Sequence, residues 1–138
     1  MHDIYHQVGI LYPSFLHGRM TFEELAQLAS AAVAPVGLKA KLTIAPFPLG
    51  ACVMRIGDTC RIFVDSRLPP PKRIHAAAHE VGHLLAVPPD AWRARTGTWY
   101  LPRDTTSSDE ERRATEFATM ATRAWATDPD PEQAFRAA

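Results

Sequence analysis

The first clearly periodic apolar pattern in the chain predicts a helix over 22–33. Thr21 stands three residues before Glu24, which is the spacing of a capping box, and the apolar residues after it recur every three or four positions. Pro35 ends the pattern, because proline disfavours helical geometry in the residue before it. We expect residues 1–20 to form an N-terminal segment ahead of this helix.

Short runs rich in β-branched and other apolar residues follow the helix. They predict three strands, at 42–44, 51–56 and 60–64. The last two runs flank Gly57-Asp58-Thr59, and a short turn that contains glycine favours a β-hairpin. The pattern therefore predicts a small three-stranded sheet.

Two more helices are predicted in the second half of the chain. The run 74–87 is rich in Ala and Leu, with Pro71 suited to a first helical turn and Pro88-Pro89 as a stop. The next helix is expected to begin near Ser107-Ser108 and to run to about Trp125. Because strand-rich and helix-rich segments are separate along the chain, the fold class predicted is α+β.

Two segments show no clear period. Residues 90–106 predict a long loop, and loops of that length often serve function. Residues 128–138 form a tail that we expect to fray. With 138 residues in all, the chain is expected to fold as one domain, 1–138.

Composition narrows the classes of function. The 15 basic and 15 acidic side chains balance, so the chain lacks the basic excess typical of proteins that bind nucleic acid directly. Two cysteines, Cys52 and Cys60, are too few for a disulfide framework or a four-cysteine zinc site, and we interpret both as small apolar strand residues. No signal-peptide pattern and no run of about 20 apolar residues is present, which predicts a cytoplasmic protein without membrane association.

The candidate chemistry lies in His79-Glu80-Val81-Gly82-His83, on the helix predicted over 74–87. Histidines four residues apart project from one helix face, so both imidazoles can bind one zinc ion. Zinc lowers the pKa of bound water to about 7, and Glu80 is placed to take the proton of that water as a general base. The pattern predicts a zinc-dependent peptidase in which Glu80 is the catalytic residue.

Gly82 lies in the middle of the motif. Glycine in a helix interior costs about 1 kcal/mol against alanine, so its presence here indicates the close approach of another element.

A third protein ligand is required, and the sequence offers acidic residues for it. A third histidine at the spacing of one known class is excluded, because Ala86 and Pro89 occupy the diagnostic positions. The acidic candidates open the next helix; they are Asp109, Glu110 and Glu111.

We favour Glu111 as the third ligand, because Ala114, Ala118 and Ala121 form an apolar stripe on its side of the helix. Glu110 shares that face more loosely and stays an alternative ligand. Either glutamate could instead close a capping box, Glu111 with Ser108 or Glu110 with Ser107.

Two further side chains have open roles. His75 lies one helical turn before His79 and could touch substrate, although a partly exposed histidine at a helix start is the commoner case. Tyr100 could donate a hydrogen bond to a developing oxyanion, or it could pack on the core together with Trp99.

Taken together, these residues resemble the ImmA/IrrE family of metallopeptidases. That family typically has His-Glu-Leu-Gly-His followed by a helix with Glu-x-x-Ala-Asn-x-Phe-Ala; here the second segment reads Glu111 to Ala118, with Thr115 in place of the asparagine. The resemblance covers about 51–121. Ala76 stands where the family commonly has threonine, and Thr119-Met120-Ala121-Thr122 replaces its Leu-Leu-Met-Pro-like segment.

The resemblance implies a small zincin-like domain of the gluzincin type. His79, His83 and Glu111 would hold zinc, and Glu80 would be the base. Members are typically intracellular and cleave a helix-turn-helix transcriptional repressor, which switches on stress-response or mobile-element genes. The alternative is a catalytically weak or inactive zinc-binding protein that regulates a DNA-binding partner.

Overall fold

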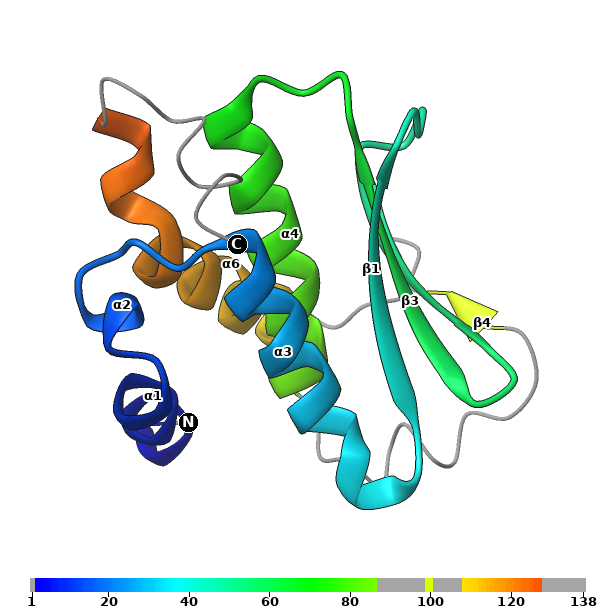
Figure 1. Ribbon diagram of the computed structural model, residues 1–138, viewed down its shortest axis with the longest axis horizontal. Coiled ribbons are helices and arrows are strands. Elements are labelled where there is room, and N and C mark those ends of the chain that lie inside the picture. The colour runs from blue at the N-terminus through cyan, green and yellow to red at the C-terminus, as the bar shows by residue number, and fades with distance from the viewer. Residues whose placement is uncertain (1, 87–98, 101–107, 128–138) are drawn as a thin grey trace.

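The computed structural model describes residues 2–86, 99–100 and 108–127, and it is an α+β fold (Figure 1). Its helices are α1 (His2–Leu11), α2 (Pro13–Leu16), α3 (Phe22–Val33), α4 (Pro70–Ala86) and α6 (Ser108–Thr122), with 3₁₀ turns η1 (Ala34–Val36) and η2 (Arg123–Thr127). Its strands are β1 (Lys39–Ala45), β2 (Ala51–Ile56), β3 (Thr59–Asp65) and β4 (Trp99–Tyr100).

The three predicted strands are confirmed, and the sheet has the order β1-β3-β2-β4. β2 and β3 form the expected antiparallel hairpin; Ile56 pairs with Thr59 across a turn in which Gly57 has a φ of 61°. That positive φ is the conformation for which glycine has no steric penalty. The sequence did not predict that β1 pairs with β3 in parallel, which places the hairpin's second strand in the middle of the sheet.

The prediction of a loop throughout 90–106 is wrong at one point. Trp99 and Tyr100 form the two-residue strand β4, which pairs with Arg55 and Met54 of β2. The pairing depends on backbone groups of β2 that are distant in sequence, and a strand of two residues is too short to be predicted from a periodic pattern. The rest of the predicted loop and the predicted tail, 128–138, lie outside the described residues.

The helix predicted over 22–33 is α3, and its capping box is present. Glu24 N–H donates to Thr21 Oγ1 over 3.2 Å, and Thr21 N–H donates to Glu24 Oε1 over 2.8 Å. Two helices that we did not predict, α1 and α2, precede it. Tyr5 and Val8 of α1 are buried, while Ile10 and Leu11 are exposed, so the apolar pattern of this segment is mixed.

The two helices predicted in the second half are confirmed with small shifts. α4 begins at Pro70, one residue before the predicted opening, because the first helical turn needs no backbone N–H from proline. α6 ends at Thr122, and the final turns before Thr127 are 3₁₀. Whether a serine caps α6 falls outside the described residues.

The helices lie on one side of the sheet, and α4 is central among them (Figure 1). It packs against α6, against α3 and against strands β2 and β3. The predicted apolar stripe of α6 is fully buried; Ala114, Ala118 and Ala121 have no exposed surface.

Both cysteines are buried strand residues without a disulfide, as expected. Across the described residues, no helix combines the length and the apolar character that crossing a bilayer requires.

Candidate metal centre

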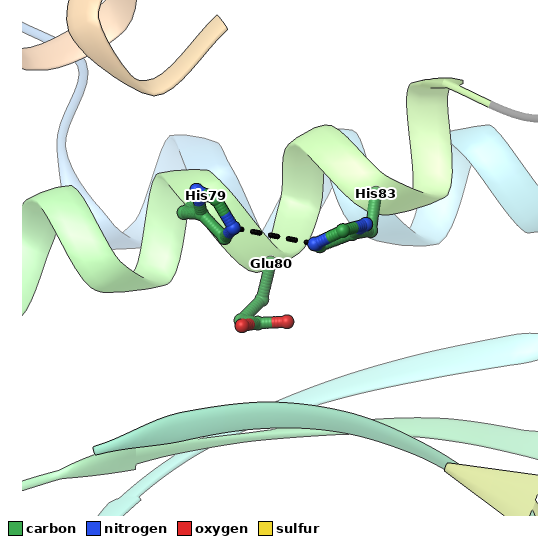
Figure 2. A group of neighbouring side chains, drawn as sticks. All are labelled: His79, Glu80 and His83. Carbon is green, nitrogen blue, oxygen red and sulfur yellow. Dashed lines mark hydrogen bonds between the residues drawn. The ribbon is translucent and has the colours of Figure 1, made fainter. Parts of the chain in front are cut away.

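The two motif histidines point to a common position beside α4. Nε2 of His79 lies 3.2 Å from Nε2 of His83, and their rings meet edge to face at 75° (Figure 2). Two nitrogens bound tetrahedrally at 2.0–2.1 Å from one zinc ion would be about 3.3–3.4 Å apart. The separation of the two nitrogens therefore suits a shared metal ion.

Glu111 of α6 reaches the same position from the neighbouring helix. Its Oε1 lies 2.8 Å from His79 Nε2, and its Oε2 lies 3.1 Å from His83 Nε2. Its side chain is 41% exposed, so the carboxylate lies on the solvent-facing side of the two imidazoles. The structure thus brings together the three residues that the sequence singled out as metal ligands.

Protonated imidazoles could hold the Glu111 carboxylate as well, so the charge state of His79 bears on the choice between an ion pair and a metal site. Burial lowers the pKa of His79; the charge of Glu111 raises it, and the neighbouring His83 lowers it further. The net direction is downward, which favours the neutral imidazole. A neutral imidazole offers a lone pair to a metal, so the electrostatics agree with the donor geometry.

Glu110 does not share the position of Glu111. Its Oε2 lies 3.0 Å from Nδ1 of His83, the ring nitrogen on the opposite side from Nε2. Thr115, at the position where the resembled family has asparagine, places Oγ1 3.4 Å from Nδ1 of His79. Helix α6 therefore contacts both nitrogens of each ring. Sequence reasoning missed this role of Glu110, and its only sequence signal is the pair of consecutive glutamates.

Glu80 lies between the histidines along α4, and its carboxylate points towards the sheet (Figure 2). It is 8% exposed, and its carboxylate lies within 4.8 Å of the ligand atoms of His79 and His83. These three residues form a group that could hold a metal ion.

Burial raises the pKa of the Cys52 thiol to about 11, and the nearby charge of Glu80 adds to the shift. A thiol with a raised pKa stays neutral, so Cys52 is not suited to act as a nucleophile.

A cavity of about 320 Å³ opens beside the group, which is the lower end of the range for small-ligand sites. Its polar wall is formed by His75, His79, Glu80, His83 and Glu111. The remaining wall is formed by Leu49, Gly50, Ala51, Leu68 and Ala76. His75 thus lies where a ligand would touch it, while Tyr100 is described only through its backbone in β4.

Comparisons of the chain with models of known protein families, with curated protein sequences and with solved structures found no match.

Proposed function

We propose that the protein is a zinc-dependent metalloendopeptidase, zincin-like and of the gluzincin type, that acts on a specific protein in the cytoplasm. The observation that carries the proposal is the convergence of His79, His83 and Glu111 next to a cavity, with the buried Glu80 carboxylate beside them. Two imidazoles and one carboxylate are a ligand set of catalytic zinc sites, which keep a position open.

The residues present fit zinc. His79 and His83 would bind it through Nε2, and Glu111 would bind it through its carboxylate. When bound, zinc supplies a water of lowered pKa, about 7, and polarises the carbonyl of the scissile peptide.

Glu80 supplies the proton transfers. Its carboxylate would accept a proton from the attacking water and deliver that proton to the nitrogen of the leaving amine as the C–N bond breaks. A purely structural site has no need of such a base. The buried position beside the cavity keeps the carboxylate next to the peptide and away from bulk solvent.

The position of β2 beside the cavity supports the proposal that an extended segment of the substrate binds there. Ala51 at the start of β2 lines the cavity, whereas β4 pairs with Met54 and Arg55 farther along β2. An extended segment of a partner protein could add to the sheet at that position, with its side chains alternating between cavity and solvent. Docking of this kind selects one partner rather than many peptides. By the resemblance to the ImmA/IrrE family, we propose a helix-turn-helix repressor as that partner.

The proposal is tested by incubating zinc-loaded protein with a helix-turn-helix repressor encoded beside it, and separately with casein. We expect cleavage of the repressor at one or few sites and little digestion of casein. Digestion of casein with the repressor left intact would contradict selective cleavage. Inactivity on both substrates, with zinc bound, would favour the alternative of a zinc-binding interaction protein.

A further inference from the structure

Glu110 holds His83 from the side opposite to the proposed metal position. We propose that Glu110 is the positioning residue of the site: its carboxylate accepts a hydrogen bond from Nδ1–H of His83 and so directs the Nε2 lone pair towards the metal position that His83 would share with His79 and Glu111. The Nδ1 to Oε2 distance is 3.0 Å. This inference rests on the proposed zinc site, and it assigns to Glu110 a role other than that of ligand.

Burial distinguishes this contact from the other ion pairs of α6. The side chains of His83 and Glu110 are 4% and 10% exposed, whereas Asp109, the preceding residue, is 56% exposed and pairs with Arg112 and Arg113. Exposed pairs contribute little, but a buried carboxylate has to be matched by a donor. The contact of Glu110 with the ring of His83 is therefore a buried one, whereas the pairs of Asp109 with its arginines are exposed.

Helix geometry explains how consecutive glutamates reach opposite sides of one ring. Successive residues of an α-helix point about 100° apart. Glu111 accordingly faces Nε2 of His83 over 3.1 Å, while Glu110 faces Nδ1 over 3.0 Å. The imidazole is held between the two carboxylates, so its rotation is set by α6.

A carboxylate on the far nitrogen has two effects on a metal ligand. It fixes the tautomer in which Nε2 is free to bind, and its charge makes the imidazole a better donor. Loss of such a partner typically lowers metal affinity about 10–100-fold. We expect Glu110→Ala to show a loss of this size, and Glu110→Gln a smaller one, because its amide oxygen still accepts from Nδ1–H but carries no charge.

The matched control is Asp109→Asn. It removes an acidic side chain from the same first turn of α6, and with it a similar interaction with the helix dipole, but Asp109 does not face the ring. We expect the zinc affinity of this variant to stay within about two-fold of the wild type, because exposed charges of this kind couple weakly to a site.

The experiment combines zinc affinity, measured by competition with a chelator, with NMR detection of the Nδ1 proton of His83 in zinc-free protein. The Nδ1 proton should be present in the wild type and in Glu110→Gln, and lost to exchange in Glu110→Ala; zinc affinity should fall in the order wild type, Gln, Ala. Unchanged zinc affinity in both Glu110 variants, or an Nδ1 proton unaffected by Glu110→Ala, would overturn the proposal. If Glu110→Ala does not fold, Glu110→Gln carries the affinity test alone.

The two readouts separate this inference from the proposed function. A wild type that binds no zinc but shows an Nδ1 proton that depends on Glu110 would contradict the zinc site and still support the orientation of His83 by Glu110. A wild type that binds zinc tightly, with affinity indifferent to Glu110, would leave the zinc site standing and overturn the positioning role.

Discussion

Gly82 of α4 lies against the backbone of Ala114 of α6. A β-carbon on Gly82 would lie 2.8 Å from Ala114 Cα and 2.9 Å from its carbonyl oxygen, closer than such atoms approach in proteins. Gly82 immediately precedes His83, and Ala114 lies one turn after Glu111. The missing side chain thus allows the two helices to approach at the point where His83 and Glu111 meet.

The first prediction is that Gly82→Ala destabilises the protein and weakens the metal site. Alanine favours a helix by about 1 kcal/mol over glycine, but the clash is with backbone and cannot be relieved by rotating a side chain. Overpacking of this kind costs about 1–3 kcal/mol, so we expect a net loss of stability by thermal unfolding. Zinc affinity should fall as well, because Glu111 moves away from the histidines.

The matched control for this change is Gly9→Ala in α1. The three atoms nearest to a β-carbon there all belong to the side chain of Leu16, with Cδ2 the nearest at 2.8 Å. Leu16 is exposed and can move, so Gly9→Ala should be neutral or slightly stabilising. Equal effects of the two substitutions would contradict the close backbone approach at Gly82.

The second prediction separates metal binding from catalysis. Glu80→Gln keeps the size of the side chain but removes the base, and none of the contacts described between His79, His83 and Glu111 involves Glu80. Zinc content should stay normal, while the cleavage rate falls at least about 100-fold, the typical share of a general base. The control is Glu116→Gln, at an exposed position of α6 that pairs with Arg112. A wild-type cleavage rate in Glu80→Gln would remove Glu80 from the mechanism.

The third prediction concerns the cavity wall that contains Leu49 and Gly50. Asp65 at the end of β3 accepts hydrogen bonds from the backbone N–H of Phe47 and from Arg67. The hydrogen bond to Phe47 holds the segment just before Leu49 and Gly50 in place. The hydrogen bond from the Arg67 side chain is the main reason that the pKa of Asp65 is lowered from 3.8 to about 2.

Because the pKa of Asp65 is lower in the folded state than in the unfolded chain, the stability of the fold should fall as the pH is lowered. The ionised form of Asp65 stabilises the fold fully above about pH 4, and that contribution is lost as the pH falls from about 4 to about 2. Asp65→Asn should therefore be less stable at pH 7 and show a shallower loss of stability over that window, as measured by denaturant unfolding. Asp58→Asn is the control, since the ion pair of Asp58 with Lys39 is long, 3.8 Å, and exposed. Parallel pH profiles for Asp65→Asn and the wild type would refute this assignment.

The sequence predicted the features that local signals determine. The spacing of His79 and His83, the capping box at Thr21 and the turn at Gly57 each depend on a few neighbouring residues, and the structure contains all three. Gly82 was informative as well. Glycine lowers the stability of a helix interior, so its presence indicated that another element approaches closely, and Ala114 is the residue that does so.

What the sequence did not predict depends on contacts between distant segments. The parallel pairing of Ala40 with Cys60 is a choice of sheet partner that no local pattern specifies. The apolar stripe of α6 favoured Glu111 over Glu110 as the third ligand, but only the approach of α6 to His83 shows that Glu110 faces Nδ1 while Glu111 faces Nε2. The group of side chains that could hold a metal ion was therefore predictable from spacing, whereas the different contacts of neighbouring glutamates depend on the packing of two helices.

The zinc content of the purified protein shows whether His79, His83 and Glu111 hold a metal ion. We expect about one zinc per chain in the wild type, and loss of that zinc in His79→Ala and in His83→Ala, because two remaining protein donors are too few for a stable tetrahedral site. Circular dichroism of the zinc-free variants would show whether they remain folded. Full zinc occupancy in the double variant His79→Ala, His83→Ala, measured by elemental analysis, would contradict the account, because the metal would then be bound elsewhere.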